Sequence, residues 1–142
     1  MINEISRVVY DGYRQFCSKR STGVKTILIV EDDAAIGEFL VQAIQQETSH
    51  QAVLAPDGFQ ALEVLRTLIP DLFILDYNLP DMNGLELYDT IHAVKVLEHL
   101  PVVIVSAEAT RIQKEVNARQ LSQLQKPFEL PDLLEALDRS IS

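Results

Sequence analysis

Short, almost uninterrupted runs of apolar residues alternate with amphipathic segments along most of this chain. The runs cover residues 26–30, 51–55, 72–75 and 102–105. Strands that are buried on both faces of a parallel sheet have this continuous apolar character. The segments between the runs repeat apolar residues at spacings of three and four, which predicts amphipathic helices over 34–46, 58–69 and 84–97.

Two weaker units complete the series. A helix is expected at about 109–119, and a last helix opens at Pro131, a residue that suits a first helical turn. Between them, Leu121 to Gln125 is mostly polar and is the least typical of the expected strands. Five β-α units in a row predict an α/β fold with a doubly wound, five-stranded parallel sheet and right-handed crossovers.

Length, net charge and cysteine content exclude several classes of protein. A chain of 142 residues suits one domain with a real core, and its net charge of −9 argues against a nucleic-acid surface. The single cysteine, Cys17, excludes an internal disulfide and fits a reducing compartment. Neither a run of membrane-spanning length nor a signal-peptide core is apparent. We therefore expect a cytoplasmic protein without a membrane partner.

Residues 1–24 differ from the rest and are predicted to be an N-terminal extension and linker, with the main domain covering 25–142. A possible helical face carries the apolar residues Ile2, Ile5, Val9 and Phe16. Gly12 weakens this helix. Two alternatives stay open: the segment is a helix that packs on the domain or on a second copy in a homodimer, or it is a frayed tail.

Polar side chains follow four of the expected strands at the point where each strand ends. Glu31 and Asp32 follow the first run, Asp76 ends the third, Ser106 follows the fourth, and Lys126 follows the polar segment. In an open parallel sheet, ligands bind outside the carboxyl ends of the strands. We therefore expect these groups to meet at one edge of the sheet.

This set of groups suits phosphoryl transfer to a carboxylate. Clustered carboxylates repel one another unless a cation intervenes, and oxygen ligands suit Mg²⁺ or Mn²⁺. Asp76 can act as a nucleophile, since aspartyl phosphates are a known class of covalent intermediate. Taken singly, each residue has an ordinary structural explanation as a turn former, helix cap or loop residue. Their joint occurrence at successive strand ends favours the functional interpretation.

Four segments of the sequence resemble those of a known protein family. From Lys25 to its end, the chain resembles the receiver domain of bacterial two-component response regulators, and most closely the single-domain chemotaxis type. The resemblance rests on four segments in order: 29–33 (IVEDD), 76–87 (DYNLPDMNGLEL), 105–109 (VSAEA) and 126–128 (KPF). It implies the flavodoxin-like receiver fold and a phosphoprotein that acts in phosphorelay signal transduction.

The resemblance also implies roles for individual residues. Asp76 matches the phosphoacceptor. Asp32 matches the direct metal ligand, Glu31 the acid that holds the metal through water, and the backbone carbonyl of Asn78 a further ligand of the expected Mg²⁺ or Mn²⁺.

Ser106 and Lys126 match the hydroxyl and the amine that contact the phosphoryl group. The bond from Lys126 to Pro127 is expected to be cis, as in the family. One departure concerns the switch position three residues before the lysine, where receivers commonly carry an aromatic residue and this chain has Gln123. Another is Arg119-Gln120, which stands where a Gly-Ala pair is usual.

The resemblance implies a signalling module that is not a conventional enzyme, although it phosphorylates and dephosphorylates itself. Its phosphoryl donor would be a histidine kinase or a histidine phosphotransfer protein, and its output would run through contacts with an unknown protein. One alternative is a receiver-like binding module that is never phosphorylated in the cell. Another is an aspartyl-phosphate phosphohydrolase, which would need a general acid where Asn78 stands.

Overall fold

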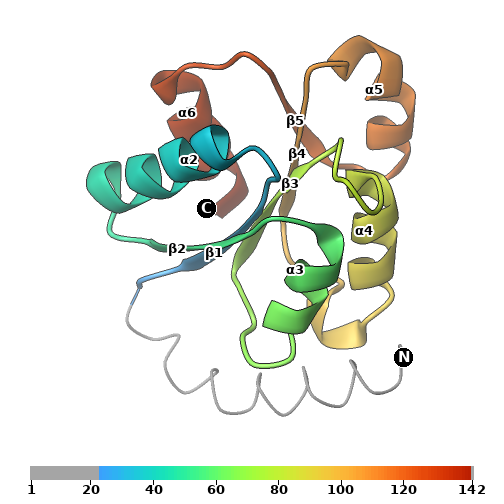
Figure 1. The fold of residues 1–142 in the computed structure, drawn as a ribbon, viewed down its shortest axis with the longest axis horizontal. Helices are drawn as coiled ribbons and strands as arrows, with labels where there is room; N and C mark the ends of the chain where they lie inside the picture. Colours follow the sequence, from blue (N-terminus) through green and yellow to red (C-terminus); the bar gives the residue numbers. More distant parts are fainter. Residues whose placement is uncertain (1–22, 142) are drawn as a thin grey trace.

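The computed structural model describes residues 23–141, which form a five-stranded parallel sheet with helices on both faces (Figure 1). The strands are β1 (Thr26–Val30), β2 (Gln51–Ala55), β3 (Leu72–Asp76), β4 (Val102–Ser106) and β5 (Ser122–Gln125). They lie in the order β2-β1-β3-β4-β5. The chain therefore adds β2 on one side of β1 and then returns to place β3 on the other side. This order confirms the predicted doubly wound sheet.

Burial explains why the strands differ in composition. Every residue of β1, β3 and β4 is buried, because these strands have neighbours on both sides and helices on both faces. The edge strands are different: β2 is largely exposed or half-buried, and in β5 only Leu124 is buried. The polar composition of β5 thus follows from its place at the edge of the sheet.

The helices form two layers around the sheet. Their bounds are α2 (Ala34–Glu47), α3 (Gly58–Val64), α4 (Gly84–His92), α5 (Ala109–Ala118) and α6 (Leu130–Ile141). Figure 1 shows α2 and α6 on one face and α3, α4 and α5 on the other. Each layer has its own apolar core: one contains Ile29, Leu40 and Leu137, and the other contains Phe73 and Ile91. The sheet separates the two cores, as in a three-layer α/β fold.

Two predicted helices are shorter in the structure. The segment predicted as a helix over 58–69 ends at Val64, after which Arg66 N and Thr67 N donate to carbonyls three residues back in tighter turns. The segment predicted over 84–97 ends at His92 and is followed by a short 3-10 turn, η2 (Lys95–Leu97). Apolar residues beyond each helix still pack inward, which explains why the apolar pattern continues past the helical geometry.

Other predictions have clear outcomes. The Lys126–Pro127 peptide bond is cis, as expected from the resemblance. The last helix begins at Leu130, with Pro131 in its first turn. The possible helix that carries Ile2 and Phe16 lies outside the described residues. Across 23–141, no helix combines the length and apolar character needed to cross a membrane.

Candidate functional site

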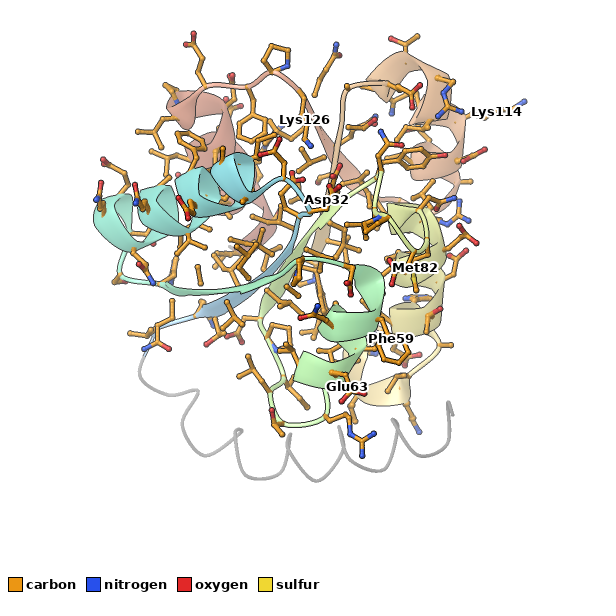
Figure 2. All side chains as sticks on the ribbon, in the orientation of Figure 1. Asp32, Phe59, Glu63, Met82, Lys114 and Lys126 are labelled. Carbon is orange, nitrogen blue, oxygen red and sulfur yellow. The ribbon has the colours of Figure 1, made fainter. Side chains whose placement is uncertain are left out.

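The polar groups expected at strand ends converge on one edge of the sheet. Asp76 is the last residue of β3 and Ser106 is the last residue of β4, while Glu31 directly follows β1 and Lys126 directly follows β5. These four strands are adjacent in the sheet. Asp32 and Lys126 are labelled at this carboxyl edge, near the start of α2 (Figure 2). The edge includes the point between β1 and β3 where the strand order reverses, the usual place for a ligand in such folds.

Three carboxylates form the centre of the site. Glu31, Asp32 and Asp76 each offer an oxygen atom, and these atoms all lie within 4.8 Å of one another. Glu31 and Asp76 are each only 3 % exposed, whereas Asp32 is exposed to solvent. Two carboxylates are therefore fixed by burial, and the third closes the cluster from the solvent side.

Lys126 is the cation of the site. Its Nζ lies 2.9 Å from Glu31 Oε1 and 3.3 Å from Asp76 Oδ1, so one ammonium group joins two buried carboxylates. Burial lowers the pKa of Lys126, but the hydrogen bonds and charges of Glu31 and Asp76 outweigh that effect and leave its pKa above the ordinary value. Lys126 is therefore positively charged at neutral pH.

One lysine does not fully compensate the acids. Burial, followed by the hydrogen bond and charge of Asp76, raises the pKa of Glu31 from 4.5 to about 7, although Lys126 and the backbone N–H of Asp33 act in the opposite direction. A bound cation would stabilise such a cluster, because it compensates the charge of the buried carboxylates. Carboxylate oxygens are also the donors that Mg²⁺ and Mn²⁺ prefer, so the residues present fit a hard divalent ion.

Asp33 has a different role from its two acidic neighbours. Its carboxylate caps α2 by accepting hydrogen bonds from Ala35 N at 2.9 Å and Ile36 N at 3.1 Å. Its own backbone N–H donates to Glu31 Oε2 at 3.2 Å. Satisfying the first turn of a helix is the usual work of an N-cap aspartate. Asp33 therefore fixes the loop that carries Glu31 and Asp32 and lies outside the carboxylate cluster.

Ser106 supplies a buried hydroxyl on the neighbouring strand. Its side chain is fully buried, and its Oγ accepts a hydrogen bond from Glu108 N at 2.8 Å. Since the hydroxyl is the acceptor in that bond, its own proton remains available for donation. The bond also ties the loop before α5 to the position of the Ser106 side chain.

The loop after Asp76 is held close to the strand end. Asn78 N donates to Asp76 Oδ1 at 3.3 Å, and Gly84 N donates to Tyr77 O at 2.8 Å. A Cβ atom at Gly84 would lie 2.5 Å from the carbonyl oxygen of Asp76, so a larger residue would displace the backbone there. Asp81 joins this loop to α3. Its carboxylate accepts hydrogen bonds from Gly58 N at 3.0 Å and from Phe59 N at 2.8 Å. Asn78 is thereby kept beside the acid cluster.

Sequence reasoning missed one group at the edge of the site. Arg111, in the first turn of α5, places Nη2 2.6 Å from Glu108 Oε2, and its Cζ lies 5.6 Å from the centre of the Tyr77 ring. The Arg111 guanidinium keeps the pKa of Glu108 below its ordinary value. The i,i+3 spacing of Glu108 and Arg111 could have indicated the ion pair. No sequence pattern indicated the contact with Tyr77.

The switch position holds an amide that bonds to α5. Gln123 Nε2 donates to the carbonyl of Ala109 at 3.3 Å and to Gln113 Oε1 at 3.0 Å. Gln113 in turn donates to Asn117 Oδ1 at 2.7 Å. A hydrogen-bonded row of amides therefore joins β5 to α5 at the position where receivers commonly carry an aromatic residue.

An apolar depression is lined in part by Lys126. It has a volume of about 380 Å³, and its apolar lining includes Ile36, Phe39, Pro127 and Phe128. The rings of Phe39 and Phe128 lie 6.2 Å apart at a tilt of 50°, and Phe39 is 42 % exposed. The start of α2 and the loop after β5 thus form an apolar border on one side of the site.

Comparison with known proteins identifies similar chains. A family model described as the response regulator receiver domain matches residues 27–138. Chemotaxis protein CheY-3 of Vibrio cholerae is 33% identical over 115 residues, which cover 80% of this chain and 88% of that protein. The DNA-binding response regulator MtrA of Mycobacterium tuberculosis is 33% identical over 110 residues, or 76% of this chain. The match spans only 46% of MtrA, about half of its length.

Solved structures give the same result for the fold. Chemotaxis response regulator CheY4 of Vibrio cholerae superposes with a TM-score of 0.77 at 25% identity, covering 82% of this chain and 98% of that one. The non-phosphorylated HemR receiver domain of Leptospira biflexa has a TM-score of 0.75 at 31% identity, covering 83% and 94% of the two chains.

Proposed function

This chain belongs to the family of response regulator receiver domains of two-component systems, and on that premise we propose that Asp76 is its phosphoacceptor. The observation that carries the proposal is the pairing of a buried carboxylate at a strand end with one ammonium group and two further acids. Lys126 lies 3.3 Å from Asp76, and Glu31 and Asp32 lie in the same cluster. The proposed donor is a histidine kinase or a histidine phosphotransfer protein.

The proposed reaction moves a phosphoryl group from phosphohistidine to Asp76. An Oδ atom of Asp76 forms the new O–P bond while the P–N bond breaks, and the departing imidazole takes up a proton. Lys126 moves from its carboxylate partners towards a phosphoryl oxygen and compensates the added negative charge. The Ser106 hydroxyl, whose proton is not used in the bond from Glu108 N, donates to another phosphoryl oxygen.

A divalent ion, Mg²⁺ or Mn²⁺, is part of the proposal. Asp32 would bind it directly, Glu31 through a water molecule, and the Asp76 carboxylate and the Asn78 carbonyl would complete the protein ligands. When bound, such an ion draws charge from the phosphoryl oxygens and aligns the donor. The raised pKa of Glu31 supports this assignment, because burial and the neighbouring Asp76 carboxylate disfavour the charged form of Glu31, and a cation would compensate that charge.

The readout is proposed to be local. An acyl phosphate on Asp76 would attract the Ser106 hydroxyl and, with it, the loop that reaches α5 through Glu108. Output would then follow through contacts with a partner protein. We assign residues 25–142 to the receiver domain and 1–24 to an extension, since β1 starts at Thr26. The proposed location is the cytoplasm, where kinases obtain ATP.

The proposal is tested by phosphorylation with a small donor. Incubation with acetyl phosphate and Mg²⁺ is expected to add the mass of one phosphoryl group, as measured by intact mass spectrometry, and Asp76→Asn is expected to abolish this addition. Asp57→Asn is the matched control, because Asp57 caps α3 and is not one of the three clustered carboxylates, and asparagine caps helices equally well. A full mass shift in Asp76→Asn would disprove the assignment, as would a wild-type protein that never gains a phosphoryl group.

A further inference from the structure

A linked set of polar side chains forms one part of the solvent side of the site. Glu108 Oε2 is bonded to Arg111 Nη2 at 2.6 Å, and the same carboxylate also interacts with the side chain of Asn78. The Arg111 guanidinium lies over the Tyr77 ring, with 5.6 Å between Cζ and the ring centre. This distance is within the range of a cation–π contact. Two loops that do not adjoin in sequence are therefore joined across the edge of the site.

The position of this set in the chain places it at the approach to the reacting groups. Asn78 lies two residues after Asp76, and Glu108 lies two residues after Ser106. Asp76 and Ser106 are buried, whereas Asn78 and Glu108 are exposed. The backbone N–H of Asn78 donates to Asp76 Oδ1, and that of Glu108 donates to Ser106 Oγ. Asn78 and Glu108 therefore form part of the exposed rim around the reacting groups, and a small donor that enters on this side passes beside them.

Charge at this approach affects an anionic donor. The site already contains three carboxylates, and an unpaired Glu108 would add a fourth negative charge on the path of the donor. Arg111 neutralises that charge and also restrains the carboxylate against Asn78. An exposed ion pair contributes little to stability, so the main effect of this pair concerns the electrostatic potential at the entrance.

We propose that Arg111 is a positioning residue for the proposed phosphoryl transfer, because it holds and neutralises Glu108 at the entrance and thereby sets the rate at which small anionic donors reach Asp76. This inference rests on the proposed function and extends it. The described partners of the Arg111 guanidinium are Glu108 and Tyr77, and neither Asp76 nor Ser106 is among them. Its effect is exerted through Glu108, and removal of Glu108 should cancel it.

The test compares the phosphorylation rates of six proteins with two donors at saturating Mg²⁺. The proteins are the wild type, Arg111→Ala, Arg111→Lys, Glu108→Gln, the double variant Arg111→Ala/Glu108→Gln and the control Lys114→Ala. Acetyl phosphate is a dianion at neutral pH, and phosphoramidate carries one net negative charge fewer. Lys114→Ala is the matched control, because Lys114 is an exposed cation on the same helix whose side chain points into solvent at its outer side (Figure 2).

Arg111→Ala is expected to slow phosphorylation by acetyl phosphate about three- to sevenfold at low ionic strength, the factor for a dianion that passes an uncompensated charge at roughly 7 Å in water. The loss should be smaller with phosphoramidate and should fall below about twofold in 1 M salt. The double variant should react at nearly the wild-type rate, and Arg111→Lys should restore most of the rate. Lys114→Ala should change nothing.

Three results would overturn the inference while the proposed function stands: an unchanged rate in Arg111→Ala, a double variant as slow as the single variant, or an equal loss with both donors that salt does not relieve. The last pattern would mean that Arg111 only supports the local structure. A wild-type protein that neither donor phosphorylates would instead overturn the proposed function, and this inference with it.

Discussion

Replacement of Glu31 by glutamine is expected to stabilise the folded protein at neutral and alkaline pH when no divalent cation is present. Glu31 is 3 % exposed and lies in the same cluster as the buried Asp76. Its pKa rises from 4.5 to about 7 on folding, mainly because burial disfavours the charged carboxylate. Glutamine has nearly the same shape and can occupy this position without a charge. The variant therefore isolates the cost of ionising Glu31.

The magnitude follows from the pKa difference between the unfolded and folded states. The folded protein binds the proton of Glu31 more tightly, so the free energy of unfolding falls as pH rises from about 4.5 to about 7 and is constant above that range. A difference of one pKa unit corresponds to about 1.4 kcal/mol. The advantage of Glu31→Gln should therefore reach about 3 kcal/mol at pH 8, and it should be less than about 1 kcal/mol at pH 5.

The assay is urea denaturation followed by far-UV circular dichroism at both pH values in the presence of EDTA. A stability change shifts the midpoint while the slope of the transition stays constant. Glu38→Gln is the matched control, because Glu38 is an exposed acid on α2 and its replacement changes the net charge equally. Saturating Mg²⁺ should remove the advantage, since the ion compensates the charge of Glu31 and is held less well by the variant.

Two outcomes would refute the reasoning. If Glu31→Gln unfolds at lower urea concentration than the wild type at pH 8 in EDTA, the ion pair with Lys126 at 2.9 Å outweighs the burial of the charge. If the advantage is the same at pH 5 and pH 8, it does not arise from ionisation. An equal gain in Glu38→Gln would point to the overall net charge of −9.

Three further predictions concern the metal, the readout and the donor. Asp32→Ala should weaken Mg²⁺ binding at least tenfold in calorimetric titration. Asp33→Ala should mainly lower helix stability, because Asp33 caps α2. A larger loss of Mg²⁺ affinity in Asp33→Ala than in Asp32→Ala would show that Asp32 is not the direct ligand. Beryllofluoride should change the backbone amide chemical shifts at the start of α5. Ser106→Ala should reduce these changes, and Gln123→Ala should largely preserve them. The opposite pattern would mean that the Gln123 side chain transmits the change. Phe39→Asp should slow transfer from a histidine phosphotransfer protein about tenfold by disrupting the apolar border beside Lys126, yet leave acetyl phosphate labelling unchanged; equal losses with both donors would indicate a damaged site.

The parts of the fold that the sequence predicts well are those where one physical requirement dominates. Strands β1, β3 and β4 need apolar side chains on both faces, so their residues form continuous apolar runs. The end of each run then marks where a polar side chain meets solvent, and this locates Asp76 and Ser106 without any structure. Helix ends were less predictable, because apolar residues such as Leu65 and Leu97 continue to pack inward after the helical hydrogen bonds have changed.

Contacts between distant loops could not be predicted from periodicity. The distance between Arg111 and Tyr77 depends on how α5 leaves the sheet after β4, and no local pattern encodes that angle. The bond between Asp81 and the first N–H groups of α3 is similar, since it joins residues 23 positions apart that meet only when β1 and β3 are paired. Such contacts require the register of the sheet before they can be derived.

Gln123 shows how a residue that departs from a family pattern can still be accommodated by the same fold. Its amide donates to Ala109 O and Gln113 Oε1, whereas its own Oε1 is buried without a hydrogen-bond partner among the described residues. Two neutral hydrogen bonds stabilise by about 1 kcal/mol each, and an unsatisfied buried acceptor costs about 1–3 kcal/mol. These contributions nearly cancel, so the amide is tolerated without anchoring α5 firmly. A side chain with so small a net contribution is poorly suited to drive a change of conformation. We therefore expect any movement after phosphorylation to be driven by Ser106 and its hydrogen bond to the backbone of Glu108.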